Sequence, residues 1–470
     1  MAESTDPVAT HSKCEVVVPQ SSQSPSEVIS RWSDHNVELP AMVIVPSTEE
    51  DIFNAIRLAK KRKLTLIPGN GGHGSFVPIT PKTLYLDMKM FNSVVLDRAS
   101  ATVHVGGGAS TGQVIEAVTA EGYYTLWPNS NAVGYVGCVL GGGNCPLNGL
   151  HGFMIDALVS IQLISQNAEK LDVSASSEGE EKALFNALCG AGHGLGVITS
   201  VAMKMFPLAN LNMASDCIWT RRAIFPSTAI GAAAEAFTQF SDPAPPLTIS
   251  MVFLRTPPNA PVPDSPTIML SASYYGPAHE GEQAVAPLYE QQLISKANKV
   301  ETTFVPMTTA NTGLDFMNVH GGYKGISSCY VSSVNAETLK KSFERWAEVG
   351  EQNHDAKRTL AVWGRFDTNK AVELGRSQEG QFKFLGVRDR GIFANAIPWA
   401  CKLETNEYLT EFCNDFMEIA RRNDAGAPRT LANNQYQGIG LEELYPSDKV
   451  AELKRVKSIW DAERIFWSPY

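Results

Sequence analysis

The chain has 470 residues, more than one ordinary domain needs, and this length alone suggests about three domains. Apolar residues make up 44% of the chain and charged residues 19%, so a large core is expected and wholesale disorder is excluded. The net charge of −10 argues against a nucleic-acid-binding surface as the main function.

The N-terminus and the cysteines indicate a compartment. The first residues contain no basic segment followed by an apolar one, so they do not match a secretory signal. No run of about 18 apolar residues predicts a membrane span. The eight cysteines are scattered, with no Cys-x-x-Cys pair and no metal-like spacing. We therefore expect free thiols, no metal site, no membrane contact and a cytoplasmic location.

The first elements form a βαβ unit. Residues 1–25 are rich in Ser, Thr, Pro and Val, and they are predicted to form an N-terminal arm. An apolar run over 42–45 predicts a buried strand, and Ser47 with Glu50 fits a capping box that opens a helix. Residues 64–67 predict the next strand. Loops that follow such strands are where open α/β sheets bind ligands.

The loop after this strand, residues 69–75, places four glycines around one histidine. Glycines allow backbone to approach a phosphate-bearing ligand closely because no Cβ intervenes. A phosphate needs no imidazole, so we interpret His73 as the residue that carries a flavin. The loop also matches the Gly-x-Gly-x-x-Gly fingerprint, which must open a helix. Pro78, Pro81 and a predicted strand over 83–88 follow instead, so we reject a Rossmann fold.

Two more glycine-rich stretches follow in the first half of the chain. A predicted strand over 101–105 and a helix over 110–121 precede the second glycine stretch, residues 127–146. The third glycine stretch spans 190–199 and contains His193, which we interpret as an ordinary loop histidine. Several close-fitting glycine loops in one chain favour a ligand larger than a mononucleotide.

The composition changes after residue 207. Alternating strands and amphipathic helices then predict a second α+β unit with an antiparallel sheet. The clearest strands are 247–254, 267–274 and 359–363, and the clearest helices are 280–293, 336–348 and 407–421. A final helix is predicted over 447–460.

Taken together, these motifs resemble the FAD-linked oxidases of the vanillyl-alcohol-oxidase superfamily, in its berberine-bridge-enzyme-like branch. The likeness covers nearly the whole chain and rests on five ordered motifs: Gly71-Gly-His73, the glycine run from Val133 to Gly143, Gly152 with Asp156, the stretch from Ala187 to Thr199, and Lys457 with Trp460-Asp461 and Phe466.

The resemblance implies an α+β fold of two domains: a PCMH-type FAD-binding domain and a substrate domain of antiparallel sheet and helices. The implied boundaries are 1–25 for the N-terminal arm, 26–208 for the FAD-binding domain, 209–429 for the substrate-binding domain, and 430–470 for a C-terminal return to the FAD-binding domain.

The family's Gly-Gly-His histidine bonds covalently to the flavin 8α-methyl group, which implies FAD attached through His73. Several relatives carry a second link from a cysteine to flavin C6, but that position is Ser130 here, so a single link is expected. The implied cofactor-binding residues are Gly69, Asn70, Gly71, Gly72, His73, Gly74, Ser75, Ser130, Asn131, Val133, Gly134, Gly137, Cys138, Gly142, Asn144, Gly196, Val197, Ile198 and Asn434.

The sequence departs from the family at the catalytic base. The family's base is usually a tyrosine in a Tyr-x-Asn-Tyr motif, whereas the matching segment, 431–436, has no tyrosine at either expected place. The candidates for the base are Tyr436, Tyr323 and Tyr330. An unperturbed tyrosine has a pKa near ~10, so any of them needs a lowered pKa to act at neutral pH.

The resemblance implies an FAD-dependent oxidase that acts on a small organic substrate of secondary metabolism. Hydride would pass to flavin N5 and dioxygen would reoxidise the flavin to give H2O2, with or without oxidative cyclisation. The missing tyrosines leave a non-redox cyclase on the same scaffold as the alternative, and a flavin-binding protein without catalysis as a third. Trp363, Arg388 and Trp399 are candidates for the pocket wall, and Phe393 for either pocket or core.

Overall fold

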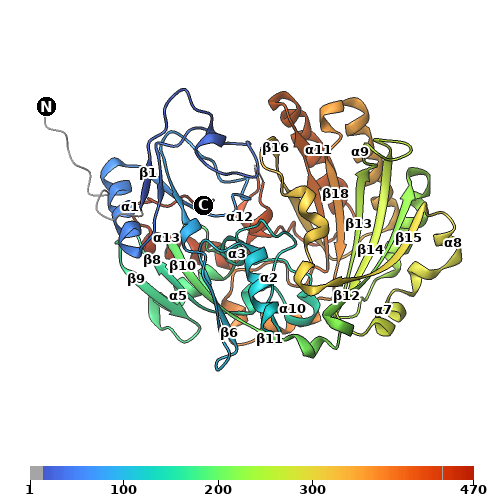
Figure 1. The fold of residues 1–470 in the computed structure, drawn as a ribbon, viewed down its shortest axis with the longest axis horizontal. Helices are drawn as coiled ribbons and strands as arrows, with labels where there is room; N and C mark the ends of the chain where they lie inside the picture. The colour runs from blue at the N-terminus through green and yellow to red at the C-terminus, as the bar shows by residue number, and fades with distance from the viewer. Residues whose placement is uncertain (1–13, 437, 470) are drawn as a thin grey trace.

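The computed structural model describes residues 14–436 and 438–469, and it has an α+β architecture. In Figure 1 the N-terminal and C-terminal parts of the chain lie together on the left, and a large antiparallel sheet from the middle of the chain lies on the right. The α+β fold with an antiparallel sheet in the second half is confirmed.

A four-stranded sheet in the order β1-β2-β4-β3 opens the fold. Its strands are β1 (Glu15–Val17), β2 (Met42–Val45), β3 (Thr65–Gly69) and β4 (Thr83–Asp87), with helix α1 (Glu49–Arg62) between β2 and β3. β4 pairs in parallel with both β2 and β3. The strand that follows the first glycine loop is therefore β4, and the rejection of a Rossmann fingerprint is confirmed.

Two details at this end differ from the sequence predictions. The capping box of α1 is formed by Thr48 and Asp51, because the Asp51 carboxylate accepts from the backbone of both Ser47 and Thr48. Within the predicted arm, β1 pairs antiparallel with β2, since its extended residues satisfy an open sheet edge. Residues 1–13 of that arm lie outside the described residues.

A five-stranded antiparallel sheet in the order β5-β6-β10-β8-β9 carries the next two glycine stretches. Its strands are β5 (Val94–Asp97), β6 (Thr102–Gly106), β8 (Leu158–Ile164), β9 (Lys170–Ser174) and β10 (Val197–Lys204). The helices around it are α2 (Thr111–Ala120), α3 (Tyr135–Leu140) and α5 (Gly179–Ala191). Part of the second glycine stretch therefore forms helix α3, which its high glycine content did not predict.

The seven-stranded antiparallel sheet has the order β15-β12-β14-β13-β18-β19-β17. Its strands are β12 (Cys217–Pro226), β13 (Leu247–Arg255), β14 (Pro266–Tyr274), β15 (Lys299–Pro306), β17 (Ser327–Val331), β18 (Leu360–Arg365) and β19 (Ile392–Ile397). Helices α6 (Ile230–Gln239), α9 (Ala336–Gln352) and α11 (Leu403–Arg421) pack on one another and on this sheet. Along β19, Ala394 and Ala396 enter the core on the helix side, so the alternate residues Phe393 and Asn395 face the other way.

One predicted helix of this half is wrong. The segment 280–293 is broken into α7 (Ala278–Ala284), a single 3-10 turn and α8 (Gln291–Ile294). Pro287 lies at the break, where proline removes a backbone donor and clashes with the preceding turn of a helix.

The C-terminal segment returns to the first sheet. Helix α13 (Ser447–Trp460) has its predicted bounds and packs against α5. Beyond it, the Leu66 amide of β3 donates to the carbonyl of Ile465 at 2.7 Å, and Phe466 forms a bridge with Leu66. This geometry suits a split first domain, whose boundaries at 26–208, 209–429 and 430–470 stay a prediction.

Candidate functional site

A cavity of about 410 Å³ lies where the three glycine stretches meet the seven-stranded sheet. Most of the predicted cofactor residues line it: Gly69, Asn70, Gly71, Gly72, His73, Gly74, Ser130, Val133, Gly134, Gly137, Cys138, Asn144, Gly196, Ile198 and Asn434. The structure does not bring the remaining four to its wall: Ser75, Asn131, Gly142 and Val197. Their predicted contact with a cofactor has no geometric support.

The first glycine loop is shaped by close backbone approaches. Gly72 has φ +67°, and a Cβ there would meet the Ser30 carbonyl at 2.5 Å. A Cβ on Gly71 would meet the Ala132 carbonyl at 2.3 Å. Only glycine therefore allows this loop to lie against both the N-terminal segment and the second glycine stretch.

Gly137 serves the cavity rather than the packing. It lies inside helix α3, is solvent-exposed and lines the cavity, and a Cβ added there meets nothing within 4 Å. Glycine inside a helix costs about 1 kcal/mol relative to alanine. Nothing in the protein fills the space beside it, so the position has the form of a cradle for a ligand that needs bare backbone.

His73 is held as a neutral ring. Its imidazole stacks on Trp32 with ring centroids 5.3 Å apart and an interplanar angle of 10°. Burial, followed by the nearby charges of His320, Lys324 and Arg31, lowers the pKa of His73 to about 3. Its Nε2 atom is buried and has no hydrogen-bond partner among the described residues. A neutral imidazole keeps a lone pair for bonding, and its buried nitrogen lacks any compensating contact.

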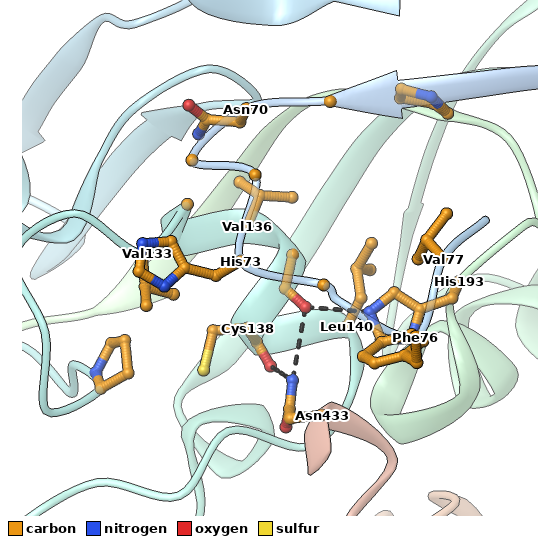
Figure 2. Close-up of a pocket in the computed structure, with 18 of the residues that line it drawn as sticks. Asn70, His73, Phe76, Val77, Val133, Val136, Cys138, Leu140, His193 and Asn433 are labelled. Atoms are coloured by element: carbon orange, nitrogen blue, oxygen red, sulfur yellow. Dashed lines mark hydrogen bonds between the residues drawn. The ribbon is translucent and has the colours of Figure 1, made fainter. Parts of the chain in front are cut away.

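The second glycine stretch is fixed by two side chains that we had not assigned to the site (Figure 2). Asn433 donates from Nδ2 to the Cys138 carbonyl at 2.9 Å and accepts from the Gly143 amide at 3.0 Å. His193 contacts the Gly137 carbonyl through Nε2 at 3.1 Å. Sequence reasoning had chosen Asn434 of the Asn-Asn pair and an ordinary loop role for His193, yet both asparagines and His193 line the cavity.

Two residues relevant to covalent chemistry are chemically quiet here. Burial raises the pKa of the Cys138 thiol to about 12, so it stays protonated. The Ser130 hydroxyl donates to the Asn318 side chain at 2.7 Å.

The tyrosines proposed as the base do not line the cavity. Tyr330 is fully buried, lies one ring behind the wall with its centroid 5.9 Å from that of Phe393, and has a pKa raised by burial. The hydroxyl of Tyr436 lies 3.4 Å from the Arg421 guanidinium, and burial raises its pKa as well. Tyr323 is half-buried in the short strand pair β16 (Tyr323–Lys324) and β20 (Trp399–Ala400). The geometry gives none of the three a catalytic role.

Three pocket candidates from the sequence also lie elsewhere. Trp363 is buried in the core on the helix side of the sheet. Arg388 makes two hydrogen bonds of 2.8 Å to the buried carboxylate of Asp156. The Trp399 ring lies under the Lys324 ammonium, whose Nζ is 4.6 Å from the ring centroid. Of the side chains weighed for this wall, only Phe393 reaches the cavity.

The wall contributed by the seven-stranded sheet is mainly apolar. Ile326, Phe393 and Asn395 come from this sheet and its β16–β17 connection, and Leu431 adjoins them. The Oδ1 atom of Asn395 is buried and without a hydrogen-bond partner in the described part of the chain. Among the described residues, no tyrosine and no carboxylate lines the cavity, so its titratable groups are Arg31, His73, Cys138 and His193.

These features fit FAD. Three features would serve a flavin nucleotide: the bare backbone at Gly137, the close-packed glycine loop, and the neutral His73 with its unpartnered nitrogen. They supply space, backbone contacts and an atom for a covalent bond.

Arg31 is the one lysine or arginine that the structure places at the described wall, and its Nη2 donates to the Gly74 carbonyl at 2.6 Å. Sequence patterns gave no signal for Arg31, because it lies about forty positions before the loop it supports.

Comparisons with known proteins agree with this assignment. A family model described as FAD binding domain matches residues 40–174. The chain is 29% identical over 462 residues to the FAD-linked oxidoreductase azaL of Aspergillus niger, covering 94% of this chain and 93% of that protein. It is also 26% identical over 456 residues to the FAD-linked oxidoreductase tazG of Aspergillus terreus, covering 94% of this chain and 88% of that protein.

The fold is shared with solved flavoproteins. BBE-like 1 of Physcomitrella patens aligns with a TM-score of 0.78 at 16% identity over 97% of this chain and 96% of that one. The 6-hydroxy-D-nicotine oxidase of Arthrobacter nicotinovorans aligns with a TM-score of 0.77 at 17% identity over the same shares. The PCMH-type FAD-binding fold is therefore confirmed. No helix in the described ranges is both long and apolar enough to span a bilayer.

Proposed function

We propose that the chain is a member of the FAD-linked oxidoreductases of the vanillyl-alcohol-oxidase superfamily, in its berberine-bridge-enzyme-like branch, and that it is an oxidase for a small organic substrate of secondary metabolism. The bound flavin would accept hydride at N5 and pass the electron pair to dioxygen as H2O2. The cavity that joins three glycine loops, His73 and an apolar sheet wall carries this proposal.

We propose that FAD is attached through His73 alone. The neutral ring and the unpartnered Nε2 support His73 as the attachment point. A second attachment at Ser130 is disfavoured, because a hydroxyl held by Asn318 is a poor nucleophile compared with a thiolate. Cys138 lines the cavity, but its raised pKa keeps the sulfur protonated.

Each side chain at the cavity wall would make its own contribution to the reaction. The aromatic ring of Phe393 and the side chain of Ile326 exclude water and favour an apolar substrate surface. Asn395 offers a neutral amide that orients a hydroxyl or carbonyl group and takes no proton. His193 also lines the wall, where its Nε2 contacts the Gly137 carbonyl and burial lowers its pKa.

The missing tyrosine at the cavity favours one alternative. A non-redox cyclase on this scaffold would need shape and orientation rather than a strong base, and the apolar wall supplies both. Oxidative cyclisation, in which the flavin oxidises the substrate and a ring closes, would combine the two proposals.

All eight cysteines are free thiols, which supports the proposed cytoplasmic location.

The test has two parts. The purified yellow protein is denatured in acid, and the flavin-bearing peptide is mapped; flavin that comes free in acid contradicts attachment through His73. A panel of phenols, alcohols and amines is then mixed with the protein without oxygen. An oxidase substrate bleaches the flavin absorbance and forms H2O2 when air is admitted. Full turnover without bleaching, oxygen use or peroxide contradicts the oxidase and supports the cyclase.

A further inference from the structure

Trp32 is buried for a reason other than joining the apolar core. It is 3% exposed, yet it belongs to none of the four apolar clusters of the described residues. Its ring stacks on the His73 imidazole at 5.3 Å and 10°. The ring contact of this buried aromatic side chain is therefore with an imidazole at the cavity.

Hydrogen bonds fix Trp32 to both parts of the chain that it joins. Its indole Nε1 donates to the Met317 carbonyl at 2.7 Å, and its backbone amide donates to the Gly72 carbonyl at 3.2 Å. Met317 belongs to the segment before β16, whereas Gly72 belongs to the first glycine loop. The indole plane that faces His73 is thus set by two anchors far apart in sequence.

Lys324 completes the arrangement. It is 1% exposed, and its ammonium lies 4.8 Å from the Trp32 ring centroid and 4.6 Å from that of Trp399. Ser33 next to Trp32 binds the same lysine twice, donating to the Lys324 carbonyl at 2.6 Å and accepting from its amide at 2.9 Å. A cation over the face of an indole is attracted to the ring, and burial strengthens this attraction, so this lysine holds the Trp32 ring in place.

We propose that Trp32 and Lys324 are positioning residues that fix the His73 imidazole for its bond to the flavin; the inference rests on the proposed covalent attachment. A side chain free to change rotamer presents its nitrogen to the flavin only part of the time, whereas the stack restricts the ring to one plane. Lys324 comes from the half of the chain with the seven-stranded sheet. Attachment therefore requires that both halves have already docked.

Trp32 and Lys324, the clamp on His73, would serve a step that forms one C–N bond and breaks two bonds to hydrogen. The 8α carbon of FAD loses a C–H bond and His73 loses its N–H bond, and a new C–N bond joins them. The released electron pair and both protons go to the flavin ring. Dioxygen then takes up the pair and the protons and leaves as H2O2.

The test follows covalent attachment, not turnover. Full-length protein is produced under riboflavin limitation and mixed with FAD in air, and acid-stable protein-bound flavin is measured over time. Non-covalent FAD binding is measured separately by quenching of flavin fluorescence. The variants are Trp32→Leu, Trp32→Phe and Lys324→Gln, and the matched control is Lys340→Gln on the exposed face of α9.

We expect Trp32→Leu to attach flavin about 10-fold or more slowly, because small misplacements of reacting groups have effects of this size. Trp32→Phe keeps a stacking ring and stays within about 3-fold of the parent, and Lys324→Gln falls between the two. Non-covalent FAD binding changes by less than about 3-fold in all of them.

Equal attachment rates in the parent and in Lys324→Gln and Trp32→Leu overturn the proposal. If Trp32→Leu does not fold, the comparison of Lys324→Gln with Lys340→Gln decides, and equal rates there overturn it. Parent protein that binds FAD without acid-stable flavin refutes covalent attachment itself, and the inference falls with it. That outcome is distinct from attachment that proceeds normally without the clamp.

Discussion

Replacing Gly137 with alanine separates folding from cofactor binding, because the two effects have opposite signs. The residue lies inside α3, and an added Cβ has no protein atom within 4 Å. Alanine in a helix interior is more stable than glycine by about 1 kcal/mol. The protein without flavin therefore gains about 1 kcal/mol in unfolding free energy, or about 1–2 °C in Tm for a chain of this length.

The same methyl group enters the space assigned to the cofactor. Overfilling a close-packed contact costs about 1–3 kcal/mol. That range weakens FAD binding by roughly 5- to 150-fold, since 1.4 kcal/mol corresponds to tenfold in Kd. Binding is measured by flavin fluorescence in a His73→Ala background, where no covalent bond conceals the affinity.

Gly231→Ala is the matched control. Gly231 lies in α6, and a Cβ there also meets nothing within 4 Å, but the residue is absent from the cavity wall. It is expected to raise Tm by a similar amount and leave FAD affinity unchanged. If Gly137→Ala binds FAD as tightly as its parent does, Gly137 does not contact the cofactor and the cradle assignment is wrong.

Three other predictions concern single side chains. The His151 pKa is lowered by burial from 6.5 to about 4, so the folded state binds fewer protons than the unfolded state between these values and stability falls as pH falls. From pH 7 to pH 5 the parent should lose about 2 kcal/mol more than His151→Gln in denaturant titrations. Arg388→Ala leaves the Asp156 carboxylate, whose side chain is 2% exposed, with the Phe153 amide at 3.0 Å and the Lys383 ammonium at 3.7 Å. The loss of the arginine should lower the unfolding free energy by about 3 kcal/mol. Tyr436→Phe should keep kcat within about 2-fold, whereas a loss of about 100-fold or more would restore this tyrosine as the base.

Local sequence patterns were enough to locate the glycine loops that line the cavity. The glycine loop with His73 follows a strand, and the predicted strand after it excluded a Rossmann fold, as β4 confirms. Such features are local: a glycine run, a strand period and a proline each act within a few residues. The predicted helix over 280–293 failed where a local signal, Pro287, was overlooked.

The side chains that surround that loop are placed by long-range contacts. Three side chains reach the glycine loops from distant segments: Arg31, Trp32 and Asn433. The sequence on either side of each residue contains no motif that predicts this role. Phe393 faces the cavity because β19 alternates and its other face is covered by helices.

The tyrosines proposed as the base also show that local sequence does not predict which side chains reach the cavity. Residue type made Tyr330 and Tyr436 plausible bases, but the depth of a side chain and the direction in which it points are set by packing over the whole fold. Short-range patterns fix which backbone forms a loop or strand. The free energy that turns a side chain toward a cavity comes from contacts made between segments hundreds of residues apart, which no local pattern contains.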